Sequence, residues 1–532
     1  MVTTLNLNIC HYLRAAFLSY GKSAQTEIAK FSDSVLENVK TKSTGEVGDL
    51  LSNLVVEIKE FDAMSDIKDP KGILAAFTSV KKRIQKLMAK YNKVNTNIDK
   101  IETSLENHKV TLLKDIAIFD DMYEKNLESF KLISLYIIAG EKKLEELNIT
   151  KNNISNINII AELTNLTEFS ALDNKISNID ALRNLTKLVD LRLDRNNIQD
   201  ISPIANLVEL TYLGAGTNDI SNIDALANLT KLNILYLNHN KINNIEVLSN
   251  HTNLTELYLW ENQISNIQPL KNLIKLKKLE LSTNDITDIT PLSNLSELNR
   301  LILSTNKIGD ISVLKNLKKL EELGISKNNI SNINIIAELT NLIKFWALDN
   351  NINDISPVRN LTKLEDLELD KNNIQDISPV SNLIELTYLG LGTNDISNID
   401  ALAKLTKLKT LYLNKNQIKD LSSLSNLTEV NNLYLWENQI SNIESLKNMV
   451  KLTKLQLTRN SIKDITPLSN LKALNHLSLS SNNVEDINIL SNLTNLEILW
   501  LDDNNISNIE PIKNLNKINK LVLNNNTISM KI

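Results

Sequence analysis

Side chains that could carry out chemistry are few in this chain. Its 532 residues include five histidines and one cysteine, Cys10, and no serine, histidine and aspartate constellation stands out among them. His108 has no second histidine or cysteine one helical turn away, which favours a polar helix position over a metal ligand. We therefore expect no catalytic residue, no metal and no cofactor, and a protein that is not an enzyme.

The glycine-containing segment GAGTN, residues 214–218, is a second candidate for a chemical role, as a phosphate-binding loop. A phosphate-binding loop needs a strand-to-helix turn and a complete GxxxxGK[ST] or GxGxxG pattern, and neither is present, so we expect no nucleotide site. Gly214 and Gly216 replace both outward residues of a predicted strand, and Gly390 and Gly392 do so again. Bare backbone at these places predicts a flat depression.

Aromatic side chains point to binding instead. They form only 4% of the chain, yet all four tryptophans fall on one predicted face, and rigid amphipathic rings are favoured anchors at interfaces. The alternative is that the rings only cover neighbouring side chains, since cross-strand pairing is itself stabilising. The predicted partner-binding residues are Tyr212, Tyr236, Tyr258, Trp260, Trp346, Tyr388, Tyr412, Tyr434, Trp436 and Trp500.

A sequence repeat of 22 residues determines where these aromatic residues lie in the fold. From Asn152 to Asn526 an asparagine recurs every 22 residues, in 18 registers, within the pattern LxxLxLxxNxIxxIxxLxx. The LxL stretch predicts a strand with both leucines inward, and the apolar residue at every third position after the asparagine predicts 3₁₀ turns. Seven of the eight prolines lie seven residues after a repeat asparagine, where a short helical turn begins. Each repeat is therefore expected to form one coil.

The repeat asparagines themselves are expected to be structural. A strand-to-turn corner buries backbone polar groups in every coil, and a side-chain amide can satisfy them as both donor and acceptor. The strand positions four and two residues before each asparagine are predicted to be exposed on a concave face. Tyr236, Tyr258 and Trp260 occupy such positions, with Tyr212 just outside the strand.

This pattern resembles the leucine-rich repeat, specifically the 22-residue type of bacterial internalins, over residues 142–532. The resemblance implies an α/β solenoid, a horseshoe with a parallel sheet on its concave side and 3₁₀ turns on its convex side. A longer period of 176 residues, eight coils, overlies the repeat: LYLWENQISNI at 257 recurs at 433. This longer period indicates duplication of an eight-coil block.

Residues 1–141 have helical spacing instead and predict an all-α coiled-coil or bundle domain. Asp69 and Pro70 mark the start of a long helix, and 23–40 and 46–61 predict two more. In the long helix, apolar residues separated by alternate steps of four and three residues form a seam along one face. The seam consists of Val80, Ile84, Leu87, Tyr91, Val94, Ile98, Ile101, Leu105, His108 and Leu112.

The words YGKSAQTEIAKFSDSVLENVK and NKVNTNIDKIETSLENHKV resemble the N-terminal portion of the toxic anion (tellurite) resistance family. The likeness spans roughly residues 20–147, after which the repeats replace the rest of the family's length. It implies a helical, cytoplasmic, stress-associated protein, and it supplies no catalytic residue.

Composition and apolar patterning limit the classes of function to be expected. The net charge of -5 gives no reason to expect nucleic acid, and the longest apolar stretch, 132–139, is too short to cross a bilayer. No signal-peptide layout or wall anchor is recognisable, so we expect a cytoplasmic location. The leading hypothesis is a scaffold that presents its concave face to a protein or a glycan. The alternatives are toxic anion resistance through the helical domain and internalin-like adhesion.

Overall fold

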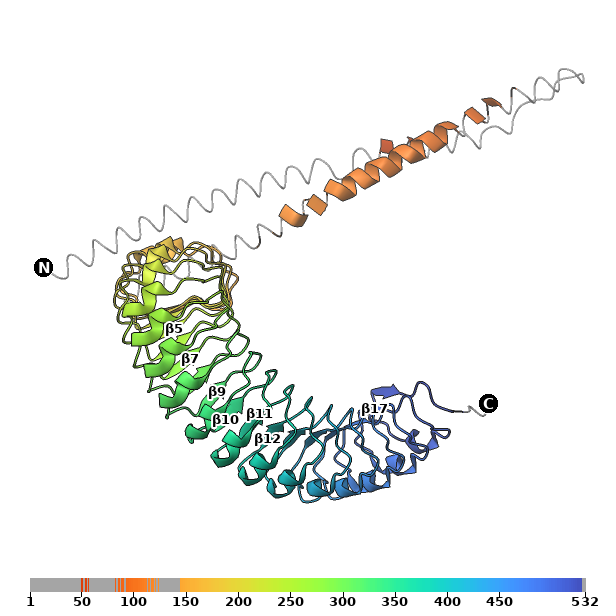
Figure 1. Ribbon diagram of the computed structural model, residues 1–532. Helices are drawn as coiled ribbons and strands as arrows, with labels where there is room; N and C mark the ends of the chain where they lie inside the picture. Colours follow the sequence, from red (N-terminus) through yellow and green to blue (C-terminus); the bar gives the residue numbers. More distant parts are fainter. Residues whose placement is uncertain are drawn as a thin grey trace, which may run out of the picture. The chain divides into compact units, whose positions relative to one another are not determined.

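The computed structural model describes residues 144–528, the run 92–111, and shorter stretches between 49 and 123. The chain divides into two units, 1–143 and 144–532, and each is described by itself. The larger unit is a single array of coils that follows an open arc (Figure 1).

Every coil of the array contributes one strand of three residues, and each strand pairs in parallel with the strand of the next coil. Asp190, for example, lies opposite Tyr212, which is 22 residues later. The repeat length thus sets the register of the sheet. The strands are β1 (Glu146–Asn148), β2 (Glu168–Ser170), β3 (Asp190–Arg192), β4 (Tyr212–Gly214), β5 (Ile234–Tyr236), β6 (Glu256–Tyr258), β7 (Lys278–Glu280), β8 (Arg300–Ile302), β9 (Glu322–Gly324), β10 (Lys344–Trp346), β11 (Asp366–Glu368), β12 (Tyr388–Gly390), β13 (Thr410–Tyr412), β14 (Asn432–Tyr434), β15 (Lys454–Gln456), β16 (His476–Ser478), β17 (Ile498–Trp500) and β18 (Lys520–Val522).

A 3₁₀ turn follows the strand in every coil from β1 to β17 and begins six residues after the repeat asparagine, as the three-residue spacing predicts. These turns lie along the outer edge of the arc (Figure 1). The seven array prolines each occupy the first turn, where no N–H is needed. The turns are η2 (Asn158–Glu162), η3 (Asp180–Leu182), η4 (Ser202–Ile204), η5 (Asp224–Leu226), η6 (Glu246–Asn250), η7 (Gln268–Asn272), η8 (Thr290–Asn294), η9 (Ser312–Asn316), η10 (Asn334–Glu338), η11 (Ser356–Asn360), η12 (Ser378–Asn382), η13 (Asp400–Lys404), η14 (Ser422–Leu424), η15 (Glu444–Leu446), η16 (Thr466–Asn470), η17 (Asn488–Asn492) and η18 (Glu510–Ile512).

The core of the array is the stack of motif leucines and isoleucines. Leu191, Leu193 and Ile198 are completely buried, and the same positions are buried in coil after coil. One coil has no second layer to cover these side chains, so the neighbouring coils must do so. The apolar core is therefore continuous along the array.

The repeat asparagine joins neighbouring coils, as the sequence predicts. The Nδ2 atom of Asn196 donates to the carbonyls of Leu193 in its own coil, at 3.0 Å, and Ala171 in the preceding coil, at 2.9 Å. Its Oδ1 atom accepts from the N–H of Ile176 at 3.0 Å. The same three kinds of contact recur from Asn174 to Asn526.

The residue before each repeat asparagine has a left-handed backbone conformation; at Arg195, for example, φ is 56°. Glycine and asparagine tolerate this conformation, whereas a β-branched residue is strained there. The array nevertheless has threonine at four of these positions: Thr217, Thr283, Thr305 and Thr393. The hydrogen bonds of the corner and the packing of its coil therefore hold this conformation in place.

In the N-terminal unit, residues 92–111 form an α-helix, as predicted. Its covered face includes Val94, Ile101 and His108 of the expected seam. The prediction is wrong at Ile98 and Leu105, which are 47% and 52% exposed, because half-buried Asn97 and Ser104 take the inward positions beside them.

The other predictions for this unit can be tested only in part. His108 interacts through Nδ1 with the carbonyl of Ser104 at 2.8 Å. Asp69, Pro70 and the helix 23–40 lie outside the described residues, as do the seam residues Val80, Ile84, Leu87, Tyr91 and Leu112. The coiled-coil or bundle therefore stays a prediction. Among the described helical residues, none forms a helix long and apolar enough to cross a bilayer.

We predict that Asn328→Ala destabilises the array by about 1 to 3 kcal/mol, because it leaves buried backbone groups unpaired. Asn328 donates to Leu303 and Ile325 and accepts from the N–H of Ile308. Urea denaturation followed by circular dichroism measures the loss. Its neighbour Asn329 is exposed, so Asn329→Ala is the matched control and should shift the transition little. Equal transitions for the two variants would contradict a structural role of the amide.

Candidate functional site

The inner side of the array presents the side chains that lie six, four and two residues before each repeat asparagine. The strands span only the positions six to four residues before it. Tyr212 and Tyr388 therefore lie inside β4 and β12, and the expectation that Tyr212 falls just outside its strand is wrong. Trp260 and Trp436 follow the ends of β6 and β14, because the chain turns there toward the asparagine corner.

Four aromatic residues of the first block form a continuous row, which we call the first ladder: Tyr212, Tyr236, Tyr258 and Trp260. Tyr236 and Tyr258 stack with their centroids 4.1 Å apart and their planes at 7°. Tyr212 lies 5.8 Å from Tyr236, and Trp260 meets Tyr258 edge-on at 5.9 Å. Parallel strands about 4.8 Å apart bring rings at matching positions to stacking distance.

The second block has the same four residues, which we call the second ladder: Tyr388, Tyr412, Tyr434 and Trp436. Its three tyrosines form a row, and Trp436 lies two residues after Tyr434 in the same coil. Tyr412 and Tyr434 stack at 4.1 Å with their planes at 4°, and Tyr388 lies 5.7 Å from Tyr412. The Nζ atom of Lys454 lies 5.1 Å from the centre of the Tyr434 ring. That of Lys415 lies 5.0 Å from the Trp436 ring. Both ladders thus have stacked tyrosines at their centre.

The other two predicted residues lie outside the ladders. Trp346 has Lys344 above its ring at 5.9 Å, and Trp500 lies between His476, at 5.5 Å, and Lys520, at 4.9 Å. The structure therefore brings seven of the ten predicted residues into ring contact, four in the first ladder and three in the second. Trp346 and Trp500 are separate surface aromatics.

The ladder rings partly cover one another. All are half-buried except Tyr258, which is buried with only 8% of its surface exposed. Burial raises the pKa of Tyr212 to about 12 and raises the phenol pKa values of Tyr258, Tyr388 and Tyr412 as well. These phenols remain protonated near neutral pH, and each can donate a hydrogen bond, as Tyr258 does to Glu256 at 2.7 Å.

The expected depression over the paired glycines does not exist. A Cβ atom at Gly392 would lie 2.6 Å from Oδ1 of Asp370 and 2.7 Å from Oδ1 of Asn414. The N–H of Gly392 donates to Asp370 at 2.7 Å, and that of Gly216 donates to Asp194 at 2.9 Å. The glycines thus make room for a carboxylate that reaches across from the preceding coil.

These two carboxylates are functional candidates that the sequence reasoning missed. Burial raises the pKa of Asp370 to about 7 and also raises that of Asp194. Arg192 and Arg195 oppose the effect at Asp194, whereas Glu368 strengthens it at Asp370. The available signal was an aspartate two residues before a repeat asparagine, with GxG at the adjacent positions of the next coil.

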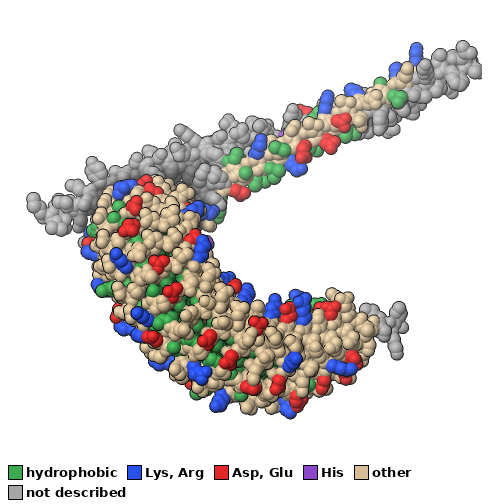
Figure 2. Space-filling view, viewed as in Figure 1, with side chains coloured by type: hydrophobic (Ala, Val, Ile, Leu, Met, Phe, Trp, Pro, Cys, Tyr) green, Lys and Arg blue, Asp and Glu red, His purple; other side chains and the backbone are tan. Residues whose placement is uncertain are grey.

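Ion pairs occupy the strands between the two ladders. Lys278 pairs with Glu256 at 3.0 Å, Arg300 bridges Glu280 and Glu322, and Lys344 also pairs with Glu322, at 2.9 Å. Acidic and basic side chains are intermixed on the side of the array that Figure 2 shows. The charges between the ladders are thus largely compensated within the chain.

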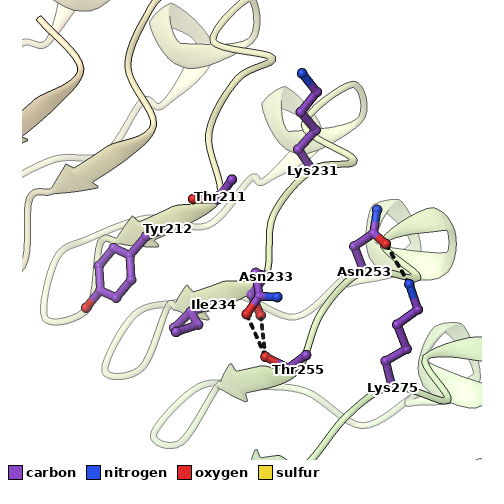
Figure 3. A pocket seen from close by; sticks show the side chains of 8 residues that line it. All are labelled: Thr211, Tyr212, Lys231, Asn233, Ile234, Asn253, Thr255 and Lys275. Carbon is purple, nitrogen blue, oxygen red and sulfur yellow. Dashed lines mark hydrogen bonds between the residues drawn. The ribbon is translucent and has the colours of Figure 1, made fainter.

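A shallow groove of about 480 Å³ begins beside Tyr212 (Figure 3). Its polar groups bond to one another, as Thr255 does with the Asn233 side chain at 2.6 Å and Lys275 with Asn253 at 2.8 Å. The first ladder therefore has a polar border on one side. The groove is lined by Thr211, Tyr212, Lys231, Asn233, Ile234, Asn253, Thr255 and Lys275.

The family comparisons agree with the two resemblances seen in the sequence. Residues 8–204 match the model of the toxic anion resistance protein (TelA) family. Residues 252–294, 384–426 and 472–514 match a model of leucine-rich repeats. The first match runs past residue 144, although 144–204 form coils of the same kind as the rest of the array.

Individual proteins show the same two likenesses. A TelA-like protein of Staphylococcus haemolyticus is 35% identical over 109 residues, 20% of this chain and 28% of that protein. The chain thus spans less than a third of the length of this relative. The internalin InlF of Listeria monocytogenes is 40% identical and covers 60% of this chain and 89% of its own, with a TM-score of 0.51. The functional domain of InlJ from the same species is 27% identical, covers 65% and 74%, and has a TM-score of 0.58.

We predict that Asp370→Asn increasingly stabilises the array as the pH rises. The folded-state pKa of Asp370 is about 7, above the unfolded value of about 3.9, so the folded state binds more protons between these pH values. Its contribution to stability therefore falls as the pH rises from about 4 to 7. Asparagine stays neutral and can still accept from Gly392. The gain at pH 8 should be on the order of 1 to 3 kcal/mol and should nearly vanish at pH 4.

Thermal melts of both proteins across this pH range measure the difference. Asp194→Asn is the matched control, and it should show a smaller pH dependence because Arg192 and Arg195 favour the charged form of Asp194. A difference between Asp370→Asn and the unsubstituted protein that does not vary with pH would contradict the prediction.

Proposed function

We propose that this leucine-rich-repeat array is a scaffold that binds a protein partner through the first and second ladders. The observation that carries the proposal is the stacking of Tyr236 on Tyr258 and of Tyr412 on Tyr434. In each pair a tryptophan follows the second tyrosine two residues later in the same coil. Tyrosine and tryptophan are enriched among the residues that dominate interface energies. Rings already held in place lose little freedom when a partner binds, which favours affinity.

The spacing of the ladders adds to this proposal. They lie eight coils apart, which corresponds to roughly 40 Å along the sheet at about 4.8 Å per strand. A partner that contacts both must be extended or must offer two copies of one surface. Such two-point binding can exceed the affinity of either contact alone, because the second contact forms at high effective concentration.

We propose a non-enzymatic role for the same surface. Its ladders offer neutral phenols and indoles, and the carboxylates beside them accept hydrogen bonds from backbone N–H groups of glycine. Such groups suit recognition of a partner. Catalysis requires a nucleophile or a base oriented toward a reacting atom.

The test is the double variant Trp260→Ala, Trp436→Ala in the full chain, because these two tryptophans end the ladders. A partner is first identified by affinity capture with the unsubstituted protein, and its affinity is then measured with purified components. We expect at least a tenfold loss of affinity, about 1.4 kcal/mol. The melting temperature should change by no more than about 3 °C, because the motif leucines remain in place.

The matched control is Trp500→Ala, which removes a tryptophan outside the ladders and should leave the affinity within about twofold. Unchanged binding by the ladder variant would overturn the proposal. A collapse of its melting temperature would instead show that the rings act in folding.

A second candidate role rests on the match of residues 8–204 to the toxic anion resistance family. If the N-terminal unit retains such an activity, expression of the full chain in a tellurite-sensitive bacterium should raise the tellurite concentration that stops growth. The Trp260→Ala, Trp436→Ala variant should protect equally well, because its substitutions lie in the array. Growth no better than with an empty vector would rule out this second role.

A further inference from the structure

Beside the first tyrosine of each ladder, the two duplicated blocks differ in charge at two positions. Arg192 corresponds to Glu368, and Glu168, on the preceding strand, corresponds to Lys344. Three other residues are the same in both blocks: Asp190, Asp194 and Tyr212 correspond to Asp366, Asp370 and Tyr388. The strand register is the same in both, since Arg192 lies opposite Gly214 and Glu368 lies opposite Gly390. The duplication therefore provides two versions of one site with opposite charge at its centre.

In the first block, Arg192 shows which ligand this arrangement of groups holds. Its Nε and Nη2 atoms donate to the two carboxylate oxygens of Asp190, at 2.9 and 2.7 Å. Its guanidinium carbon lies 4.7 Å from the centre of the Tyr212 ring. A paired carboxylate and a stacked aromatic ring are the two contacts that suit a planar guanidinium. The site is thus filled by a side chain of the protein itself.

In the second block, the same groups have no such cation. Within residues 144–528, none of Asp366, Glu368 and Asp370 forms an ion pair, and no cation lies over the Tyr388 ring. The Oδ1 atom of Asp366 is buried and has no hydrogen-bond partner. The second block therefore offers the carboxylates and the ring without the guanidinium.

The cations nearest to this site are engaged elsewhere. Lys344 pairs with Glu322 at 2.9 Å and lies over Trp346. Burial raises the pKa of Asp366, and a hydrogen bond from the Trp346 side chain and the charge of Lys344 oppose that rise. Lys371 lies 3.8 Å from Asp349. In the part of the chain that the structure describes, no group of acidic, histidine or cysteine side chains converges as metal ligands do. The carboxylates without an ion pair and the Tyr388 ring therefore suit an extended planar cation better than a metal ion.

We propose that Asp366, Glu368, Asp370 and Tyr388 form a binding site for an arginine side chain of the protein partner. The inference rests on the proposed function, because that partner supplies the arginine. Asp366 accepts a hydrogen bond from the guanidinium, and Tyr388 stacks against it, as Asp190 and Tyr212 do for Arg192. Burial raises the pKa values of Glu368 and Asp370, and a bound guanidinium stabilises their charged forms. This arrangement favours a basic surface and selects against an acidic one.

A reciprocal exchange of Arg192 and Glu368 tests the site in the full-length protein. The probe is an acetylated and amidated peptide, Gly-Ser-Arg-Ser-Gly, and its control has citrulline, a neutral isostere, in place of arginine. Saturation-transfer NMR at low ionic strength measures weak binding. We expect the arginine peptide to bind at least fivefold more tightly than the citrulline peptide.

Glu368→Arg should fill the site from within and reduce binding of the arginine peptide at least fivefold. It should also raise the melting temperature, because the new guanidinium pairs with Asp366. Arg192→Glu should create a second site and increase the saturation-transfer signal up to twofold. Glu368→Gln, which removes one charge and adds no cation, should weaken binding by less than Glu368→Arg does.

Equal binding of the two peptides, or undiminished binding by folded Glu368→Arg, would overturn the arginine site. This failure is separate from failure of the proposed function. If the ladder variant loses its partner while Glu368→Arg binds the peptide normally, the scaffold proposal stands and the arginine site falls. If the peptide results are as expected but the ladder variant keeps its partner, the scaffold proposal falls and the site remains a local guanidinium receptor.

Discussion

One side-chain amide in each coil holds the array together at its most demanding point. The chain must turn sharply after each strand, and this turn leaves carbonyls and an N–H inside the protein, away from water. The repeat asparagine bonds to carbonyls of its own coil and to one carbonyl and one N–H group of the preceding coil, as Asn196 does. Because the partners lie at fixed offsets, neither the coil length nor the register can vary.

The binding surface follows from this fixed register. Parallel strands repeat at about 4.8 Å, so rings at the same position in adjacent coils stack without any special adjustment of the backbone. The pairs Tyr236 with Tyr258 and Tyr412 with Tyr434 have the same separation, 4.1 Å, although they lie eight coils apart. The regular backbone thus allows a small number of substitutions on the inner side to set the chemistry of each ladder.

Sequence reasoning succeeded where one residue type has one physical role. Every predicted strand, turn and asparagine contact of the array depends on neighbours at fixed offsets, and these offsets are visible in the sequence. It failed at Gly216 and Gly392, where the sequence shows the missing side chains but not that Asp194 and Asp370 extend into the space from the preceding coil. It also failed at Ile98 and Leu105, because apolar spacing alone does not identify which of two adjacent helix positions is covered.

The uniform coil length also affects how such a surface can evolve. Recombination between two coils of one gene, or between two copies of the eight-coil block, inserts or removes whole coils and leaves every asparagine contact intact. Insertion or removal of one coil between the two ladders changes their separation by one strand spacing, about 4.8 Å, and leaves the ladders themselves unaltered. The distance between contact points can therefore be adjusted to a new partner in small, equal steps, independently of the residues that touch it.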